Sequence, residues 1–192
     1  MQIKQKEVFM FTKAIFEEKT LKDKIILSML ATLALAITAQ ISFHIPITPV
    51  PITLQVLAML IIGFTFSEKL AVYSVIQYIA LGLMGLPVFS DGKNGISVFL
   101  SPTGGYVIGF ILMAFIIPKT LKMWKSPIIS GICGIFVLYA MGIAYLSCFL
   151  IANGQNPMVS YALAAVPFIG VDLVKLLIAV SVYSCIKKTK ES

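Results

Sequence analysis

The sequence predicts an all-α membrane protein, a bundle of six transmembrane helices with both termini in the cytoplasm. Three observations lead to this fold class. Of the 192 residues, 59% are hydrophobic and only 12% are charged, whereas about 25% of the residues of a soluble domain are charged. The hydrophobic residues form six runs, and nearly all lysines lie beside these runs on one side of the expected membrane. The runs are apolar on every face, which excludes the alternating pattern of a transmembrane β-barrel.

The six apolar runs are separated by connections of different length. They span residues 25–43, 52–66, 70–86, 105–117, 128–152 and 159–186. A helix needs about 20 residues to cross the hydrocarbon core, so the shorter runs indicate helix ends that continue into the connections or a locally thin bundle. We expect three parts: a cytoplasmic N-terminal segment (1–24), a six-helix membrane domain (25–186) and a cytoplasmic tail (187–192). This division leaves no room for a separate nucleotide-hydrolysing domain.

The distribution of lysine sets the expected orientation, because cytoplasmic loops of membrane proteins collect basic residues. All fifteen basic residues are lysines. Six precede the first run, one lies between the second and third, three lie between the fourth and fifth, and three follow the sixth, whereas the opposite connections contain only Lys93. The partition predicts an even number of spans. It also explains the basic excess without a nucleic-acid partner.

Two features near the N-terminus concern what the chain contacts. Residues 8–16 are mostly apolar and lie among Lys13, Glu17 and Glu18, a pattern typical of an amphipathic helix on the lipid membrane surface; a loosely ordered tail is the alternative. In the first run, Ser28, Thr32 and Ala36 repeat every four residues. Small residues at this spacing let another helix approach closely. We take these three residues as a candidate surface for docking a partner subunit, and a helix of the same chain is the alternative.

Polar residues lie at the start of the second run and inside the third. The connection PITPVPITLQ (46–55) contains three prolines that stiffen the backbone, and Thr53 and Gln55 follow them at the start of the second helix. In the third run, Gln77 and Tyr78 place an amide beside a phenol in an otherwise apolar span. Each side chain is a candidate ligand contact, and a hydrogen bond between helices is the alternative for the third run.

The connection 87–104 is the longest one on the outer side and is rich in Gly, Ser and Asn. Its length favours a lid or a binding loop over a simple linker. The segment SPTGGY closes it, so that Gly104, Gly105 and Tyr106 open the fourth helix. Free N–H groups at a helix start favour an anionic group such as a carboxylate.

Asp172 and Lys175 are charged residues inside the sixth run. An ionised side chain near the bilayer centre costs at least about 2.5 to 3.5 kcal/mol. Residues three positions apart share one helical face, so the two charges can partly neutralise each other while facing the bundle. Counted from the cytoplasmic end of the run, Asp172 lies in the outer half of the membrane, within reach of a ligand from outside. A salt bridge that only fixes helix packing is the alternative.

Residues typical of catalysis are nearly absent. His44 is the only histidine, and the three cysteines lie inside apolar runs without a CxxC spacing. No cluster of acids and histidines suggests a metal, and no phosphate-binding loop is present. We therefore expect no enzyme activity, cofactor or metal. If transport is driven by ATP, another subunit must hydrolyse it.

Four motifs together resemble a known family. They are PITPVPITLQ (46–55), YIALGLMGLPVF (78–89), SPTGGYVIGF (101–110) and PFIGVDLVK (167–175). In this order they are similar to the biotin-specific substrate-binding (S) components of energy-coupling factor (ECF) vitamin transporters, the BioY family. The resemblance covers about residues 28–186.

The resemblance implies a multi-pass protein of the bacterial cell membrane that captures biotin from outside. It implies docking onto a transmembrane coupling subunit and two cytoplasmic ATPase subunits. The family's helix-six acid and lysine fall on Asp172 and Lys175, and its loop motifs fall on residues 51–55 and 103–106. One departure is the sequence Gly170-Val171-Asp172, where the family usually has Pro-Gly-Asp.

Biotin chemistry matches the candidate residues. A carboxylate can accept from the ureido N–H groups, and an ammonium group can donate to the ureido carbonyl. The candidate substrate-binding residues are Asp172, Lys175, Gln55, Thr53, Gln77, Tyr78, Gly104, Gly105 and Tyr106. Two alternatives remain open: an S component for another vitamin, such as thiamin or niacin, and a proton-coupled secondary transporter with Asp172 as the proton carrier.

Overall fold

Six α-helices make up most of the chain that the computed structural model describes, residues 20–159 and 163–191. The helices are α2 (Leu21–Gln40), α3 (Gln55–Thr65), α4 (Glu68–Leu83), α5 (Gly104–Trp124), α6 (Pro127–Ala152) and α8 (Val166–Glu191). Each of them overlaps one of the six predicted apolar runs, so the predominantly helical fold is confirmed. Three of them, α5, α6 and α8, are long and apolar enough to cross a membrane, and α3 is a shorter apolar helix. The amphipathic pattern of residues 8–16 lies outside the described residues.

Several predicted runs begin or end differently in the structure; the sixth, expected over 159–186, corresponds to α8, which starts at Val166 and continues to Glu191 in the predicted tail. The first run was expected to continue to residue 43, but α2 ends at Gln40 and Ser42–Phe43 forms a short strand, β1. It pairs antiparallel with β2, Ile52–Thr53. The proline-rich segment between the two strands cannot continue a helix. As one of the two interpretations of a short run allows, the fourth run, 105–117, is extended, because α5 continues through Pro118 to Trp124. Its last turns are therefore amphipathic, with the Lys119 ammonium 5.1 Å from the centre of the Phe115 ring.

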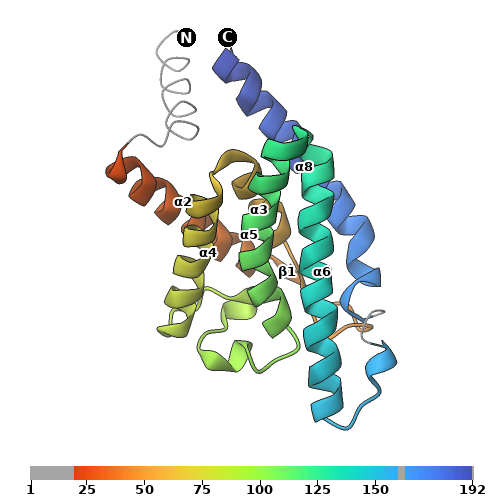
Figure 1. The fold of residues 1–192 in the computed structure, drawn as a ribbon. Helices are drawn as coiled ribbons and strands as arrows, with labels where there is room; N and C mark the ends of the chain where they lie inside the picture. The colour runs from red at the N-terminus through yellow and green to blue at the C-terminus, as the bar shows by residue number, and fades with distance from the viewer. Residues whose placement is uncertain (1–19, 160–162, 192) are drawn as a thin grey trace.

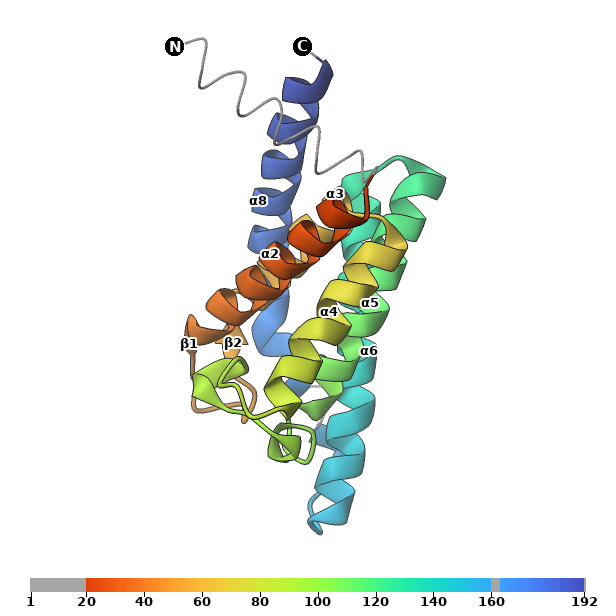
Figure 2. The ribbon, with the colours of Figure 1, turned by 90° about the vertical axis from the view of Figure 1, so that its left-hand side faces the viewer.

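The helices pack around α3 and α5 (Figure 1), which contact each other. α3 also packs against α8 and α2, while α5 lies between α4 and α6. Buried side chains from these helices form the main core, among them Met59, Leu60, Met113, Ile117 and Leu138. Figure 2 shows α2 crossing the bundle obliquely toward the β1–β2 ribbon, beside the connection that follows α4.

The small residues of α2 face the inside of the chain. Ser28 is fully buried and Thr32 is nearly so. The Thr32 hydroxyl lies 3.0 Å from the Ser74 carbonyl oxygen and 3.1 Å from Gln77 Oε1, both in α4. Of the two neighbours that the spacing allowed, the structure therefore places a helix of the same chain there. Ser28 and Thr32 are not at the surface for a partner subunit, and Ala36 packs against the core.

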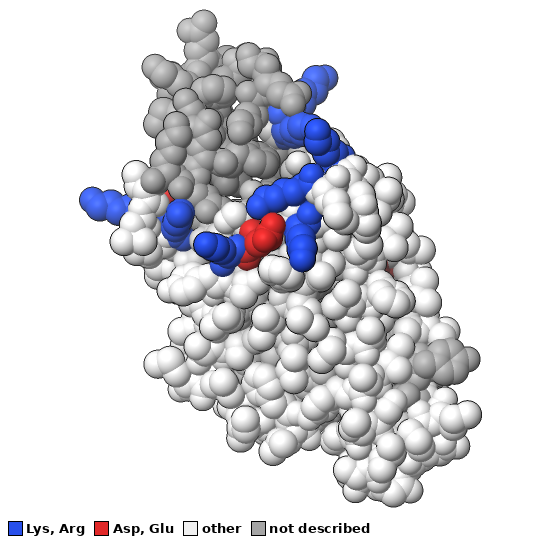
Figure 3. Space-filling model, in the orientation of Figure 1, with Lys and Arg blue, Asp and Glu red and all other residues white. Residues whose placement is uncertain are grey.

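Charged side chains gather at one end of the bundle. The start of α2, the start of α4 and the end of α5 meet at this end, where Figure 3 shows lysines around an acidic residue. Here Lys122 Nζ lies 3.1 Å from Glu68 Oε1. Below this end the visible face carries almost no charge, and α2 exposes apolar side chains such as Met29, Leu33 and Ile37. An uncharged belt next to a basic end is the surface expected of a protein in a bilayer.

Candidate ligand-binding site

A pocket lies at the end of the bundle away from the lysine cluster, between α3, α4, α5, α6 and α8. Its polar walls are Thr53, Gln55, Tyr78, Ser90, Thr103, Tyr106, Tyr139, Asp172 and Lys175. Its apolar walls include Val56, Phe89, Val98, Phe110, Leu138 and Phe168. A mostly apolar cavity with a few convergent polar groups is typical of small-molecule sites. The outer connections contribute to it as well, because residues 50–53 and 89–103 supply part of the wall.

The charged pair of α8 is almost fully buried in the pocket. Lys175 Nζ lies 2.6 Å from Asp172 Oδ1, and the two side chains are 5% and 3% exposed. The Tyr139 hydroxyl of α6 donates to Asp172 Oδ2 at 2.7 Å. Each carboxylate oxygen thus has one donor. Among the described residues Lys175 donates only to Asp172, so the ammonium group has N–H donors left for an acceptor on a ligand.

A second polar pair lies across the pocket at the start of α3. Gln55 Nε2 donates to the Tyr78 hydroxyl at 2.9 Å, and that hydroxyl donates to the Val88 carbonyl at 3.1 Å. The Thr53 hydroxyl lies 3.2 Å from Gln55 Oε1. Leu54, the residue before α3, gives no side-chain cap, so the Thr53 hydroxyl accepts the first helical amide of Gln55 instead. This chain of bonds fixes the Gln55 amide toward the cavity.

The start of α5 supplies the third polar group. The Ser101 and Thr103 hydroxyls lie 2.7 Å apart, and Thr103 lines the pocket. The Tyr106 hydroxyl donates to the Ala164 carbonyl, which connects α5 to the segment before α8. Six predicted residues therefore meet in one cavity: Thr53, Gln55, Tyr78, Tyr106, Asp172 and Lys175.

Three predicted residues lie elsewhere. Gln77 points to α2, where it accepts from Thr32. The Gly104 amide donates to the Ser101 carbonyl at 3.0 Å, so the turn itself uses this N–H group. A Cβ on Gly105 would lie 2.4 Å from Tyr145 Cβ and 2.7 Å from the Met141 carbonyl oxygen. The paired glycines thus allow α5 to approach α6, a role that a helix-start motif does not reveal.

Ser90 and Tyr139 are polar wall residues that sequence reasoning did not find, and Tyr139 is the one that contacts Asp172. A phenol in an apolar run was the available signal, and the same signal identified Tyr78. In the fifth run, however, Tyr139 and Tyr145 are equivalent by composition. Only the packing of α6 against α8 shows that Tyr139 faces Asp172, whereas Tyr145 donates to the Phe99 carbonyl.

Comparison with known proteins gives matches over most of the chain. Residues 10–192 match the model of the BioY family. The chain is 36% identical to the biotin transporter BioY of Thermotoga maritima over 147 residues, which cover 75% of this chain and 85% of the relative. It is 37% identical to a probable biotin transporter BioY of Pyrococcus horikoshii, covering 76% and 84%.

Among solved structures, the chain resembles the crystal structure of the S component for biotin from an ECF-type ABC transporter. The TM-score is 0.77 at 27% sequence identity, and the match covers 86% of this chain and 90% of that one.

Proposed function

The chain belongs to the BioY family, and we propose that it binds biotin as the substrate-binding component of an ECF transporter. It is a transport component rather than an enzyme. The observation that carries the proposal is the buried Asp172–Lys175 pair in a pocket that also contains an amide and several hydroxyl groups. This set matches the ureido ring of biotin, which has two N–H donors next to one carbonyl acceptor.

The proposed contacts follow from the free hydrogen-bonding capacity of each group. Asp172 accepts a ureido N–H, since a carboxylate oxygen can accept more than one hydrogen bond. Lys175 donates to the ureido carbonyl with an N–H that Asp172 does not use. Gln55 and the Tyr78 and Thr53 hydroxyls complete the polar set, and the apolar wall around Val56, Phe110 and Phe168 surrounds the bicyclic ring.

For the carboxylate tail of biotin we propose the start of α5, where the helix dipole favours negative charge. Thr103 and Tyr106 reach the cavity from there. The amides of Gly104 and Gly105 remain part of this helix start, but the Gly104 N–H is already bonded to Ser101. The Thr103 hydroxyl is therefore the more accessible donor.

We further propose that the chain crosses the membrane six times, with residues 1–24 and the tail 187–192 in the cytoplasm. The lysine cluster at one end of the bundle supports this orientation. The pocket then opens to the outer side of a bacterial cell membrane, and the basic end faces a transmembrane coupling subunit and two ATPase subunits.

Calorimetric titration of the purified protein tests the proposed substrate. We expect tight, stoichiometric binding of biotin, and no binding of thiamin or niacin at the same concentrations. An analogue without the ureido ring should bind far more weakly, because unpaired buried polar groups cost about 1 to 3 kcal/mol each. Tight binding of another vitamin in place of biotin would overturn the proposal.

A further inference from the structure

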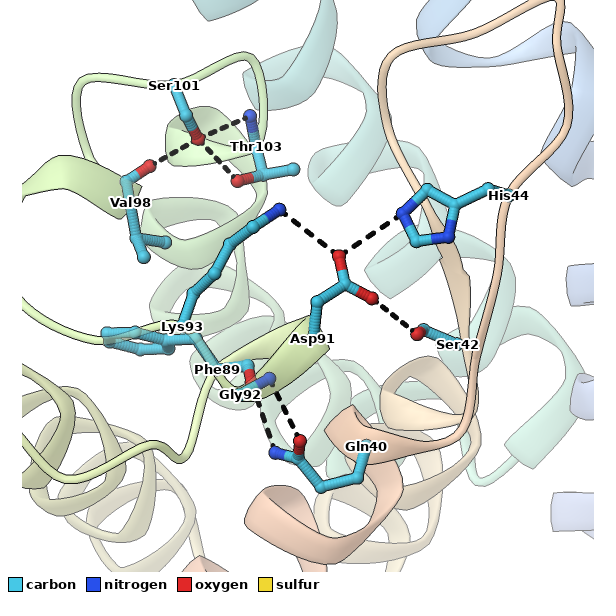
Figure 4. A network of polar contacts seen from close by, with 10 residues as sticks. All are labelled: Gln40, Ser42, His44, Phe89, Asp91, Gly92, Lys93, Val98, Ser101 and Thr103. Atoms are coloured by element: carbon cyan, nitrogen blue, oxygen red, sulfur yellow. Dashed lines mark hydrogen bonds and ion pairs between the residues drawn. The ribbon is translucent and has the colours of Figure 1, made fainter.

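Asp91 lies at the centre of a polar network on the outer surface, next to the pocket but not in its wall. Its carboxylate accepts from the Ser42 hydroxyl at 2.7 Å through Oδ1. Oδ2 lies 3.1 Å from Lys93 Nζ and 3.2 Å from His44 Nε2. Figure 4 shows these contacts between the connection 87–104 and the segment that follows α2.

Gln40 at the end of α2 extends the same network. Its Nε2 donates to the Phe89 carbonyl at 3.1 Å, and its Oε1 accepts from the Gly92 amide at 3.1 Å. Gln40, Ser42 and His44 therefore hold the short segment 89–93 by side-chain contacts. In the sequence, α3 and α4 lie between residues 40–44 and the segment 89–93.

The backbone of Asp91 shows that this side chain is held under constraint. Its φ angle is 61°, in the left-handed region that non-glycine residues rarely adopt. Partial burial raises the pKa of Asp91, but the hydrogen bond from Ser42, followed by the contacts with Lys93 and His44, lowers it below its usual value. The carboxylate is thus ionised at neutral pH and keeps its three partners.

The segment that Asp91 holds includes a wall of the pocket. Phe89 is only 2% exposed, and its ring meets Tyr78 edge-on with centres 5.4 Å apart. The ring also fills the space beside Gly82, where a Cβ would lie 2.2 Å from Phe89 Cζ. Phe89 and Ser90 line the cavity together with Tyr78 and Gln55.

We propose that Asp91 is a positioning residue that clasps the connection 87–104 to β1 and to His44, keeps Phe89 in the pocket wall, and thereby slows release of the bound ligand. This inference rests on the proposed function, because the ligand whose release is measured is biotin. Asp91 acts through Phe89 and does not itself reach the cavity. Loss of Asp91 should therefore raise the rate constant for dissociation of biotin. The rate constant for association depends on how biotin encounters the pocket.

The test is a dissociation measurement on the full chain. Purified protein is loaded with labelled biotin, and release is followed after addition of excess unlabelled biotin. Asp91→Gly removes the side-chain contacts, and glycine adopts the left-handed backbone conformation without strain. A change in the release rate then reflects the lost contacts and not backbone strain. We expect release about tenfold faster, given the strength of hydrogen bonds to a charged group at a partly exposed site, and an unchanged association rate.

Two further variants make the result specific. Asp91→Asn tolerates the same backbone conformation and can still accept from Ser42, so its release should lie between that of the wild type and Asp91→Gly. Ser42→Ala should accelerate release in the wild type but add nothing to Asp91→Gly. Glu68→Gln is the matched control: it removes a carboxylate with the same 3.1 Å lysine contact at the opposite end of the molecule, and release should not change.

The outcomes separate the clasp from the proposed function. Wild-type protein that binds biotin, with unchanged release from both Asp91 variants, overturns the clasp and leaves the function intact. Equal acceleration by Glu68→Gln also overturns it, because the effect would then be general loss of stability. Wild-type protein that does not bind biotin overturns the proposed function and the inference together. If Asp91→Gly does not fold, Asp91→Asn decides by its own release rate.

Discussion

The carboxylate of Asp172 is held from two sides before any ligand arrives. Lys175 contacts one oxygen and Tyr139 the other. Removing one partner of a buried ion pair costs about 3 to 5 kcal/mol, because it leaves an uncompensated charge. A ligand that offers both a donor and an acceptor can join this arrangement without breaking it. The pair is therefore suited to a ring in which an N–H group lies next to a carbonyl.

Tyr139→Phe should weaken biotin binding about tenfold, since it removes one hydrogen bond to a charged acceptor and keeps the ring. The carboxylate then loses the contact that fixes its orientation. Titration calorimetry measures the change. Tyr73→Phe is the control, because Tyr73 is a half-exposed tyrosine of α4 outside the pocket, and its affinity should equal that of the wild type. Equal affinities for all three proteins would show that Tyr139 does not position Asp172.

At the residue scale, the sequence predicts the site wherever a polar group is out of place in an apolar run. Asp172 and Lys175 stand out by charge, Gln55 by its position at a helix start, and Tyr78 as a phenol beside the amide of Gln77. Tyr139 does not stand out, because tyrosine is common in apolar spans and only the facing helix gives it a role. Gln77 shows the reverse error: a polar group in an apolar run that is satisfied by Thr32 instead of lining the site.

The contact between α5 and α6 depends on glycines at the element scale. Gly105 lies under Tyr145, and a Cβ on Gly134 would lie 2.4 Å from Ile117 Cγ1. Because glycine has no side chain, the two apolar helices approach closely at these positions, as helices with small residues do in membrane proteins. The start of α5, and with it Thr103 and Tyr106, is thereby placed at the pocket.

Gly105→Ala should lower the free energy of unfolding by about 1 to 3 kcal/mol. The added methyl group overpacks the contact between α5 and α6, because it meets the backbone carbonyl of Met141. Melting in detergent, followed by fluorescence, measures the change. Gly170→Ala provides the comparison, since nothing lies within 4 Å of a Cβ there and alanine favours the helix. If Gly105→Ala melts at the wild-type temperature, the close approach of α5 and α6 at Gly105 is not required for the stability of the fold.

Sequence reasoning located the helices but not their ends. The apolar runs follow from composition alone, and all six overlap helices in the structure. The end of α2 was not predictable, because pairing of Ser42–Phe43 with Ile52–Thr53 depends on a turn that brings distant residues together. For the short fourth run, extension into the connection was one of two interpretations, and α5 shows that extension through Pro118 to Trp124.

On the scale of the whole molecule, charge and hydrophobicity are separated along one axis. The lysine cluster lies at one end (Figure 3), the pocket and the Asp91 clasp lie near the other, and exposed apolar side chains lie between them. This order matches a protein that receives its ligand on one side of a membrane and contacts cytoplasmic partners on the other. The proposed orientation rests on the positive-inside rule.

Cysteine labelling in intact cells tests this orientation. In a background without the three native cysteines, Asn94→Cys should react with a membrane-impermeant maleimide, because residue 94 belongs to the outer connection. Lys125→Cys, in the turn between α5 and α6, should react only after the cells are opened. The reverse pattern would contradict the proposed topology, although the pocket itself would be unaffected.

The central claim is that the buried pair of α8 binds biotin, and the affinity of two variants tests it most directly. Asp172→Asn and Lys175→Ala should each weaken biotin binding at least tenfold, about 1.4 kcal/mol, in titration calorimetry on protein that retains its helical content. Lys122→Ala, at the lysine cluster, should bind as the wild type does. Wild-type affinity in both pair variants would contradict the account and leave Asp172–Lys175 as a contact that only joins helices.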